Sequence, residues 1–192
     1  QYARVSTDAD RRPWCLTVSF THPHDPYVAR RKYWDLYEGI AELDPPVEDL
    51  GYANQDPHSR RLIDACDSHK FDITRETVRR ARQGYFANIS YIDDKVGDLL
   101  ETLRTTRMLD NTIVLFTSDH GDMLGERGLW FKMSFFEGSA RVPLMVAGPG
   151  VTPRLVNEPV STLDINPTLA DLAGIDIGEI LPWTDGESLV PL

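Results

Sequence analysis

The amino-acid sequence predicts an α/β fold with a doubly wound, mainly parallel sheet. Apolar runs typical of buried strands occupy Trp14–Phe20, Ile113–Phe116 and Val142–Ala147, and helical patterns lie between and after them. Strands that alternate with helices favour a parallel sheet whose two faces are both covered by helices. A chain of 192 residues is long enough for one domain with a substantial core, so we expect a single domain over residues 1–192.

A turn-rich loop follows the first predicted strand. Thr21–Tyr27 contains His22, His24 and Asp25, with a proline on either side of His24–Asp25. Proline fixes its own φ near roughly -65° and so limits the conformations of this loop. Ligands of open α/β sheets bind outside the carboxyl ends of the strands, which makes the loop a candidate part of a site. A lone loop histidine is more often a surface residue, so the residues alone leave both interpretations of His22 and His24 open.

Two helical patterns separate the first and second predicted strands. A short helix is expected over Arg30–Ile40, and a much stronger pattern covers Asp72–Met108 with Asp72 as its N-cap. Gly84 and Gly97 lie inside the second pattern, where each costs up to about 1 kcal/mol relative to alanine and can bend or break the helix. The apolar face of this helix consists of Tyr85, Ile89, Ile92, Val96, Leu99 and Leu103.

A last helix is expected after the third predicted strand. Asn166 is its expected N-cap, Pro167 its first residue and Gly174 its end. Leu169 and Leu172 are expected to face inward.

The second predicted strand ends in the polar run Thr117–Asp122, which contains the strongest metal-ligand candidates. Asp119 and His120 offer a carboxylate and an imidazole, both common ligands of divalent cations, at the point where the backbone turns. Two ligands do not complete such a site, so others must come from elsewhere. Three glycines follow, at 121, 125 and 128, and favour a flexible loop. The adjacent Asp93 and Asp94 are not expected to bind a metal, because paired acids on the solvated side of a helix are common.

Composition excludes several classes of protein. The formal net charge is -10, and the basic residues are scattered, which argues against a nucleic-acid-binding surface. No stretch approaches the roughly 20 apolar residues of a membrane span. The two cysteines, Cys15 and Cys66, are expected to be reduced thiols. No signal peptide is visible, and on that ground alone we expect a cytoplasmic location; a homo-oligomer is compatible with the sequence.

The motifs around the candidate metal ligands resemble those of a known family. Thr117–Glu126, Gly128–Lys132, Phe136–Glu137 and Arg141–Leu144 occur in the order and spacing found in type I sulfatases of the alkaline phosphatase superfamily. The resemblance implies an alkaline-phosphatase-like fold and metal-dependent hydrolysis of a sulfate ester. The loop Thr21–Tyr27 and the motif that begins at Met123 are most similar to members that act on choline-O-sulfate, so that small molecule is the expected substrate and partner.

The resemblance also implies roles for individual residues. His24 and Lys132 match residues that bind the sulfate group and serve catalysis, while Asp119 and His120 match metal ligands. Many members have asparagine where this chain has His120, so Ca²⁺, Mg²⁺ and Mn²⁺ all stay open. The nucleophile implied is a formylglycine made from a Cys-x-Pro-Ser-Arg motif. Neither cysteine lies in such a motif, so we expect the nucleophile upstream and interpret the chain as an interior fragment, inactive alone.

Two alternatives stay open from the sequence. A phosphonate or phosphate ester hydrolase of the same superfamily would use the same residues on a tetrahedral phosphorus. A sulfatase-like binding module without catalysis would lack the nucleophile. The aromatic residues Trp130, Phe131, Phe135 and Phe136 offer faces for a quaternary ammonium, although core packing is the more common use of such residues.

Overall fold

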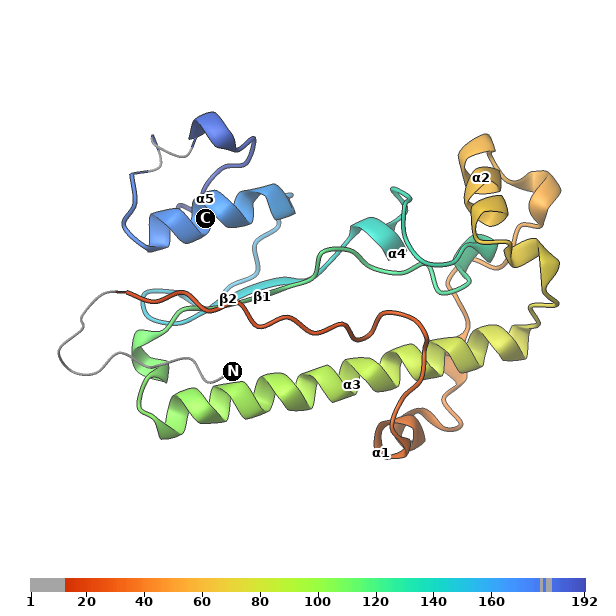
Figure 1. Cartoon of the computed structure of the whole chain (residues 1–192), viewed down its shortest axis with the longest axis horizontal. Helices are drawn as coiled ribbons and strands as arrows, with labels where there is room; N and C mark the ends of the chain where they lie inside the picture. Colours follow the sequence, from red (N-terminus) through yellow and green to blue (C-terminus); the bar gives the residue numbers. More distant parts are fainter. Residues whose placement is uncertain (1–12, 177, 179–180) are drawn as a thin grey trace. The chain divides into compact units, whose positions relative to one another are not determined.

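The computed structural model describes residues 13–176, 178 and 181–192. These residues fall into two compact units (Figure 1). The larger unit is Phe20–Thr152, and the smaller one combines residues up to Ser19 with Pro153–Leu192. The expectation of a single domain over 1–192 stays a prediction, and all the candidate site residues belong to the larger unit.

The long predicted helix is the main scaffold of the larger unit (Figure 1). It is α3, Arg75–Thr105, continuous over 31 residues. The prediction of Asp72 as N-cap is wrong, because the helix starts after Thr74, whose hydroxyl accepts a hydrogen bond from the backbone N–H of Thr77 at 3.2 Å. The helix does not break at either glycine. Gly84 instead allows a close approach, since a Cβ built there would lie 2.2 Å from the carbonyl oxygen of Tyr27.

The two glycines of α3 give a matched test of this packing. Gly84→Ala is expected to lower the free energy of unfolding by about 1–3 kcal/mol, because the new methyl group overlaps the Tyr27 carbonyl. Gly97 has no atom within 4 Å of a built Cβ, so Gly97→Ala is expected to raise it by up to about 1 kcal/mol. Urea denaturation of both variants measures the two effects. A Gly84→Ala protein as stable as Gly97→Ala would contradict the close contact.

Short helices lie against one side of α3. The helix predicted over Arg30–Ile40 is divided into α1, Arg31–Trp34, and a 3₁₀ turn, Asp35–Tyr37. Asp94 of α3 accepts hydrogen bonds from Lys32 Nζ at 2.8 Å and Tyr33 Oη at 2.7 Å. The Asp94 carboxylate therefore ties α1 to α3, consistent with its exclusion as a metal ligand. Further 3₁₀ turns are Ala41–Leu43, Tyr52–Asn54, Ser68–Lys70, Leu109–Asn111, Glu126–Gly128, Thr162–Asp164 and Leu181–Trp183.

The sheet in the described residues has two strands. β1, Val114–Thr117, pairs antiparallel with β2, Leu144–Ala147, and Val114 lies opposite Ala147. A parallel arrangement was expected, but it needs a crossover of a dozen or more residues that is usually helical. The segment between these strands holds only the four-residue helix α4, Glu137–Ala140. The prediction of a strand at Trp14–Phe20 is also wrong: this run forms no regular structure and its side chains are exposed, because an apolar pattern does not by itself supply a pairing partner.

The hydrophobic core of the larger unit includes side chains of the loop that follows β1. Helix α2, Pro57–Ala65, contributes Leu62 and Ile63, and the loop contributes Met123 and Leu129, each only 1% exposed. Phe136 packs against this cluster. The expectation of a flexible loop is therefore wrong, because its apolar side chains form part of the core.

The smaller unit contains the last predicted helix. It is α5, Ile165–Leu172, with Gly174 in the left-handed conformation just after its end. The N-terminus differs from the prediction of Asn166 as N-cap: Ser161 and Asp164 form a capping box that starts a 3₁₀ turn leading into α5. Pro167, Thr168 and Ala170 are buried, whereas Leu169 and Leu172 are not. Within the described part of the chain, none of the helices has the length and hydropathy that crossing a bilayer requires.

Candidate active site

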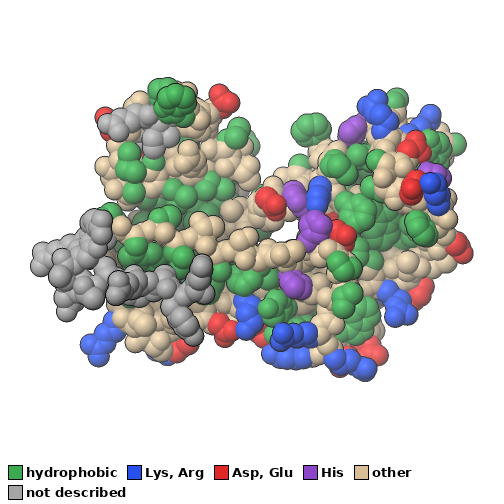
Figure 2. Space-filling view, in the orientation of Figure 1, with side chains coloured by type: hydrophobic (Ala, Val, Ile, Leu, Met, Phe, Trp, Pro, Cys, Tyr) green, Lys and Arg blue, Asp and Glu red, His purple; other side chains and the backbone are tan. Residues whose placement is uncertain are grey.

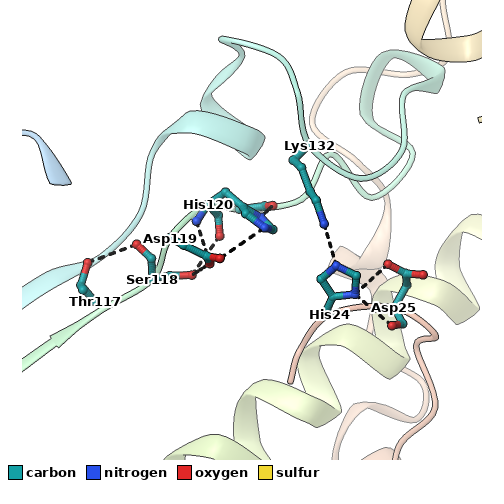
Figure 3. A network of polar contacts seen from close by, with 8 residues as sticks. His24, Asp25, Thr117, Ser118, Asp119, His120 and Lys132 are labelled. Atoms are coloured by element: carbon teal, nitrogen blue, oxygen red, sulfur yellow. Dashed lines mark hydrogen bonds and ion pairs between the residues drawn. The ribbon is translucent and has the colours of Figure 1, made fainter. Parts of the chain in front are cut away.

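Asp119 and His120 lie directly beyond the end of β1 (Figure 3). The Asp119 side chain is 85% exposed, and its Oδ1 accepts a hydrogen bond from the backbone N–H of His120 at 3.0 Å. Burial acts to raise the pKa of the Asp119 carboxyl, but this hydrogen bond and the nearby His120 ring outweigh it, so the pKa is lowered. Asp119 is therefore held as a carboxylate and open to a ligand.

The hydrogen bonding of His120 fixes its tautomer. Nδ1 lies 2.8 Å from the carbonyl oxygen of Gly121, which can only accept, so Nδ1 carries the proton. The other ring nitrogen, Nε2, lies 3.5 Å from Asp119 Oδ2, and in the tautomer protonated at Nδ1 it offers a lone pair to a ligand. Two ligand atoms each at roughly 2.1 Å from one divalent ion would be separated by about this distance. The donor set and this separation fit a divalent metal ion, and the Gly121 carbonyl orients the His120 ring as is usual for a ligating histidine.

Asp119 and His120 do not form a complete site within the described residues. No group of three or more His, Cys, Asp or Glu side chains that could hold a metal is found there. The two residues supply one carboxylate and one imidazole, and the rest of a coordination shell would come from other groups.

His24 and Lys132 are in direct contact, although 108 positions separate them in the sequence. Lys132 Nζ lies 2.6 Å from His24 Nε2 (Figure 3). His24 Nδ1 faces the backbone carbonyl oxygen of Asp25 at 3.0 Å and Oδ1 of the same residue at 2.9 Å, so Nδ1 is protonated. The hydrogen bond to Lys132 therefore has the ammonium as donor and a neutral imidazole as acceptor. Together the two residues present one positive charge and one transferable proton.

The two pairs lie close to each other. The ring centroids of His24 and His120 are 6.3 Å apart, close enough for a single small oxyanion to contact both pairs. Figure 2 shows histidine, basic and acidic side chains gathered at one place on this face of the larger unit. The structure thus brings together all four residues named from the sequence, while His22 lies apart from them, with its ring against Tyr91 at 5.2 Å.

Residues that the sequence did not mark also contribute to the site. Tyr27 Oη donates a hydrogen bond to Asp122 Oδ2 at 2.8 Å. Partial burial raises the pKa of both side chains. The exposed His58 places Nε2 3.0 Å from the carbonyl oxygen of Met133, next to Lys132. No local pattern could have indicated these contacts, since their partners are 95 and 75 positions away.

The aromatic residues near the loop do not form one cluster. Phe135 is 98% exposed, and Phe136 packs on the core with the Arg127 guanidinium 4.7 Å from its ring. Trp130 instead faces Tyr27, with ring centroids 6.3 Å apart. Core packing thus accounts for Phe136, and the ring contact with Tyr27 accounts for Trp130.

Comparison with known proteins agrees with the motifs and the geometry. The family model described as "Sulfatase" matches residues 2–175. The chain belongs to the sulfatase family. It is 66% identical over 192 residues to the choline-sulfatase of Rhizobium meliloti (strain 1021), covering all of this chain and 38% of that protein. It is 44% identical over 131 residues to arylsulfatase K of Danio rerio, covering 66% of this chain and 23% of that protein. This sulfatase-family chain thus spans well under half the length of these relatives.

Solved structures confirm the predicted α/β, alkaline-phosphatase-like class for this sulfatase-family chain. The phosphonate monoester hydrolase of Silicibacter pomeroyi superposes with a TM-score of 0.78 at 29% identity, covering 88% of this chain and 35% of that one. A sulfatase described as putative from Bacteroides fragilis gives a TM-score of 0.61 at 29% identity, covering 85% and 33%. The fold is therefore shared between hydrolases named for sulfur and for phosphorus esters.

Proposed function

We propose that this chain carries part of the catalytic domain of an enzyme that hydrolyses choline-O-sulfate to choline and sulfate. The observation that supports this most directly is the 66% identity to a choline-sulfatase over all 192 residues. Such identity over a whole segment, site loops included, favours the same substrate over a related one.

His24 and Lys132 bind the sulfate group in this proposal. Their shared positive charge faces the oxygens on which negative charge develops, and preorganised charge of this kind is usually a large catalytic contribution. As an oxygen of the nucleophile bonds to sulfur, the bond between sulfur and the choline oxygen breaks and its electron pair stays on the choline oxygen. The proton held between Lys132 Nζ and His24 Nε2 moves to it, so that choline leaves as an alcohol.

Asp119 and His120 hold a divalent cation in this proposal. When bound, the cation would neutralise charge on the sulfate oxygens and on the attacking group. Hydrogen bonding by the Gly121 carbonyl keeps His120 Nε2 free for it, and the pair leaves Ca²⁺, Mg²⁺ and Mn²⁺ all open. We assign the nucleophile to a formylglycine outside these 192 residues, because neither Cys15 nor Cys66 lies in a Cys-x-Pro-Ser-Arg motif.

A phosphonate monoester hydrolase is the second candidate. It is favoured by the TM-score of 0.78 to the Silicibacter pomeroyi enzyme. The identity to that enzyme is 29%, far below that to the choline-sulfatase. The same four residues would serve a tetrahedral phosphorus equally well, so the site alone does not rank the two substrates.

Hydrolysis of choline-O-sulfate and of a phosphonate monoester by the full-length protein distinguishes these candidates. We expect kcat/KM for choline-O-sulfate to exceed that for the phosphonate by at least about 100-fold, which corresponds to roughly 2.7 kcal/mol of differential transition-state binding. Both assays need added Ca²⁺, Mg²⁺ or Mn²⁺ in turn. Preference for the phosphonate would favour the second candidate, and no turnover of either with any metal would favour a binding module.

A further inference from the structure

The side chain that connects the two halves of the site is Asp122, which has no role in the proposed chemistry. Its Oδ2 accepts a hydrogen bond from Tyr27 Oη at 2.8 Å, and its Oδ1 accepts one from the backbone N–H of Leu124 at 2.9 Å. The carboxylate also interacts with the backbone N–H of Phe131. The Asp122 carboxylate thus contacts three segments, at Tyr27, at Leu124 and at Phe131.

Each of these segments carries a residue of the site. Tyr27 lies three residues after His24, and Phe131 directly precedes Lys132. Asp122 itself lies two residues after His120. The Asp122 carboxylate therefore lies behind the contact between His24 and Lys132 and connects it to the end of β1.

The backbone around Lys132 needs such support. Phe131 and Met133, on either side of it, have φ values of 62° and 71°, a left-handed conformation that is unfavourable for residues other than glycine. The Phe131 carbonyl oxygen also accepts a hydrogen bond from the Met123 N–H at 2.7 Å. The N–H and the carbonyl oxygen of Phe131 both have partners, Asp122 and Met123. These contacts hold the conformation that directs the Lys132 side chain toward His24.

The Tyr27 segment is fixed equally closely. Its carbonyl oxygen lies against Gly84 of α3, and its ring faces Trp130 and Tyr85 at centroid distances of 6.3 Å each. Only the hydroxyl of Tyr27 reaches the Asp122 carboxylate. The hydrogen bond of this one oxygen atom adds to the ring contact with Trp130 in connecting the two loops.

We propose that Tyr27 and Asp122 are positioning residues that hold His24 and Lys132 at hydrogen-bonding distance beside the end of β1. This inference rests on the proposed sulfate ester hydrolysis for its kinetic consequence, but not for its structural one. Neither residue touches the reacting atoms. They act by fixing the geometry in which the proton is shared.

Tyr27→Phe in the full-length protein tests the proposal, because it removes only the oxygen that contacts Asp122. We expect kcat for choline-O-sulfate to fall about 10- to 100-fold, the range typical when a group behind a functional residue is lost, with KM changed less than about threefold and the melting temperature retained. Tyr85→Phe is the matched control, since the Tyr85 hydroxyl makes no hydrogen bond to the residues that the structure describes. An unchanged kcat in Tyr27→Phe, or an equal loss in Tyr85→Phe, would overturn the proposal.

A second variant tests whether the two residues act together, and a second measurement does not depend on turnover. Asp122→Ala should lower kcat at least as much as Tyr27→Phe, and adding Tyr27→Phe to it should have no further effect, whereas additive losses would show that the two residues act separately. Amide hydrogen exchange should rise in both loops, 21–27 and 121–133, in Tyr27→Phe but not in α3. If the wild-type protein hydrolyses neither substrate, the proposed function fails, and the exchange measurement alone supports or overturns the positioning role.

Discussion

Lys132→Ala in the full-length protein is expected to lower kcat for choline-O-sulfate by at least about 100-fold. The substitution removes the ammonium group in contact with His24 Nε2, which in the proposed function both faces the sulfate group and supplies the proton. Loss of a positioned proton donor costs about 10²–10⁴-fold, and loss of the preorganised charge adds to it. Steady-state kinetics with sulfate release as the readout measures the effect.

Lys70→Ala is the matched control for Lys132→Ala. Lys70 forms an exposed ion pair with Asp67 at 2.8 Å, and such pairs contribute at most about 1 kcal/mol to stability. Its loss should leave kcat unchanged. If Lys132→Ala retained turnover at the level of Lys70→Ala, Lys132 would have no part in the reaction.

Asp119→Ala is expected to weaken divalent metal binding by at least about 100-fold. Loss of groups behind a ligand already costs 10–100-fold in affinity, and Asp119 contributes the only carboxylate that faces His120 Nε2 among the residues described. Calorimetric titration of the chelator-treated full-length protein with Mn²⁺ or Ca²⁺ measures the change without relying on turnover.

Asp93→Ala is the control for the metal measurement. Asp93 belongs to the other adjacent pair of acids in the sequence, on α3, and its loss should leave the metal affinity unchanged. Equal affinities for the two variants would show that Asp119 is not a ligand and would leave His120 without its partner.

The parts of the site that local sequence could predict are those that follow a strand. Asp119 and His120 stand at the end of an apolar run, and the prediction of β1 was confirmed within one residue. The pairing of His24 with Lys132 has no local signal, because it depends on how the chain folds over 108 positions. Only the resemblance to a family placed these two residues in one site.

The errors in the predicted fold have the same origin. Periodicity located α3 correctly, since a helix is a local structure, but Thr74 rather than Asp72 caps it because either side chain satisfies the N-cap preference. The apolar run at Trp14–Phe20 indicated burial, which the structure does not show. The site loop was judged flexible because α2, its partner in the core, is distant in sequence.

The contact between Tyr27 and Gly84 has a consequence for how related chains can diverge. Residues 28–83 form a stretch of the larger unit that begins and ends at one contact, because the carbonyl oxygen of Tyr27 lies against Gly84 of α3. Packing of Tyr27 on Gly84 therefore holds the two ends of this stretch together, whatever path the chain takes between them. The length of the connection between α2 and α3 can therefore vary without displacing these two ends, whereas the stretch before α2 is constrained, because Val47 and Gln55 contact Arg127 of the site loop.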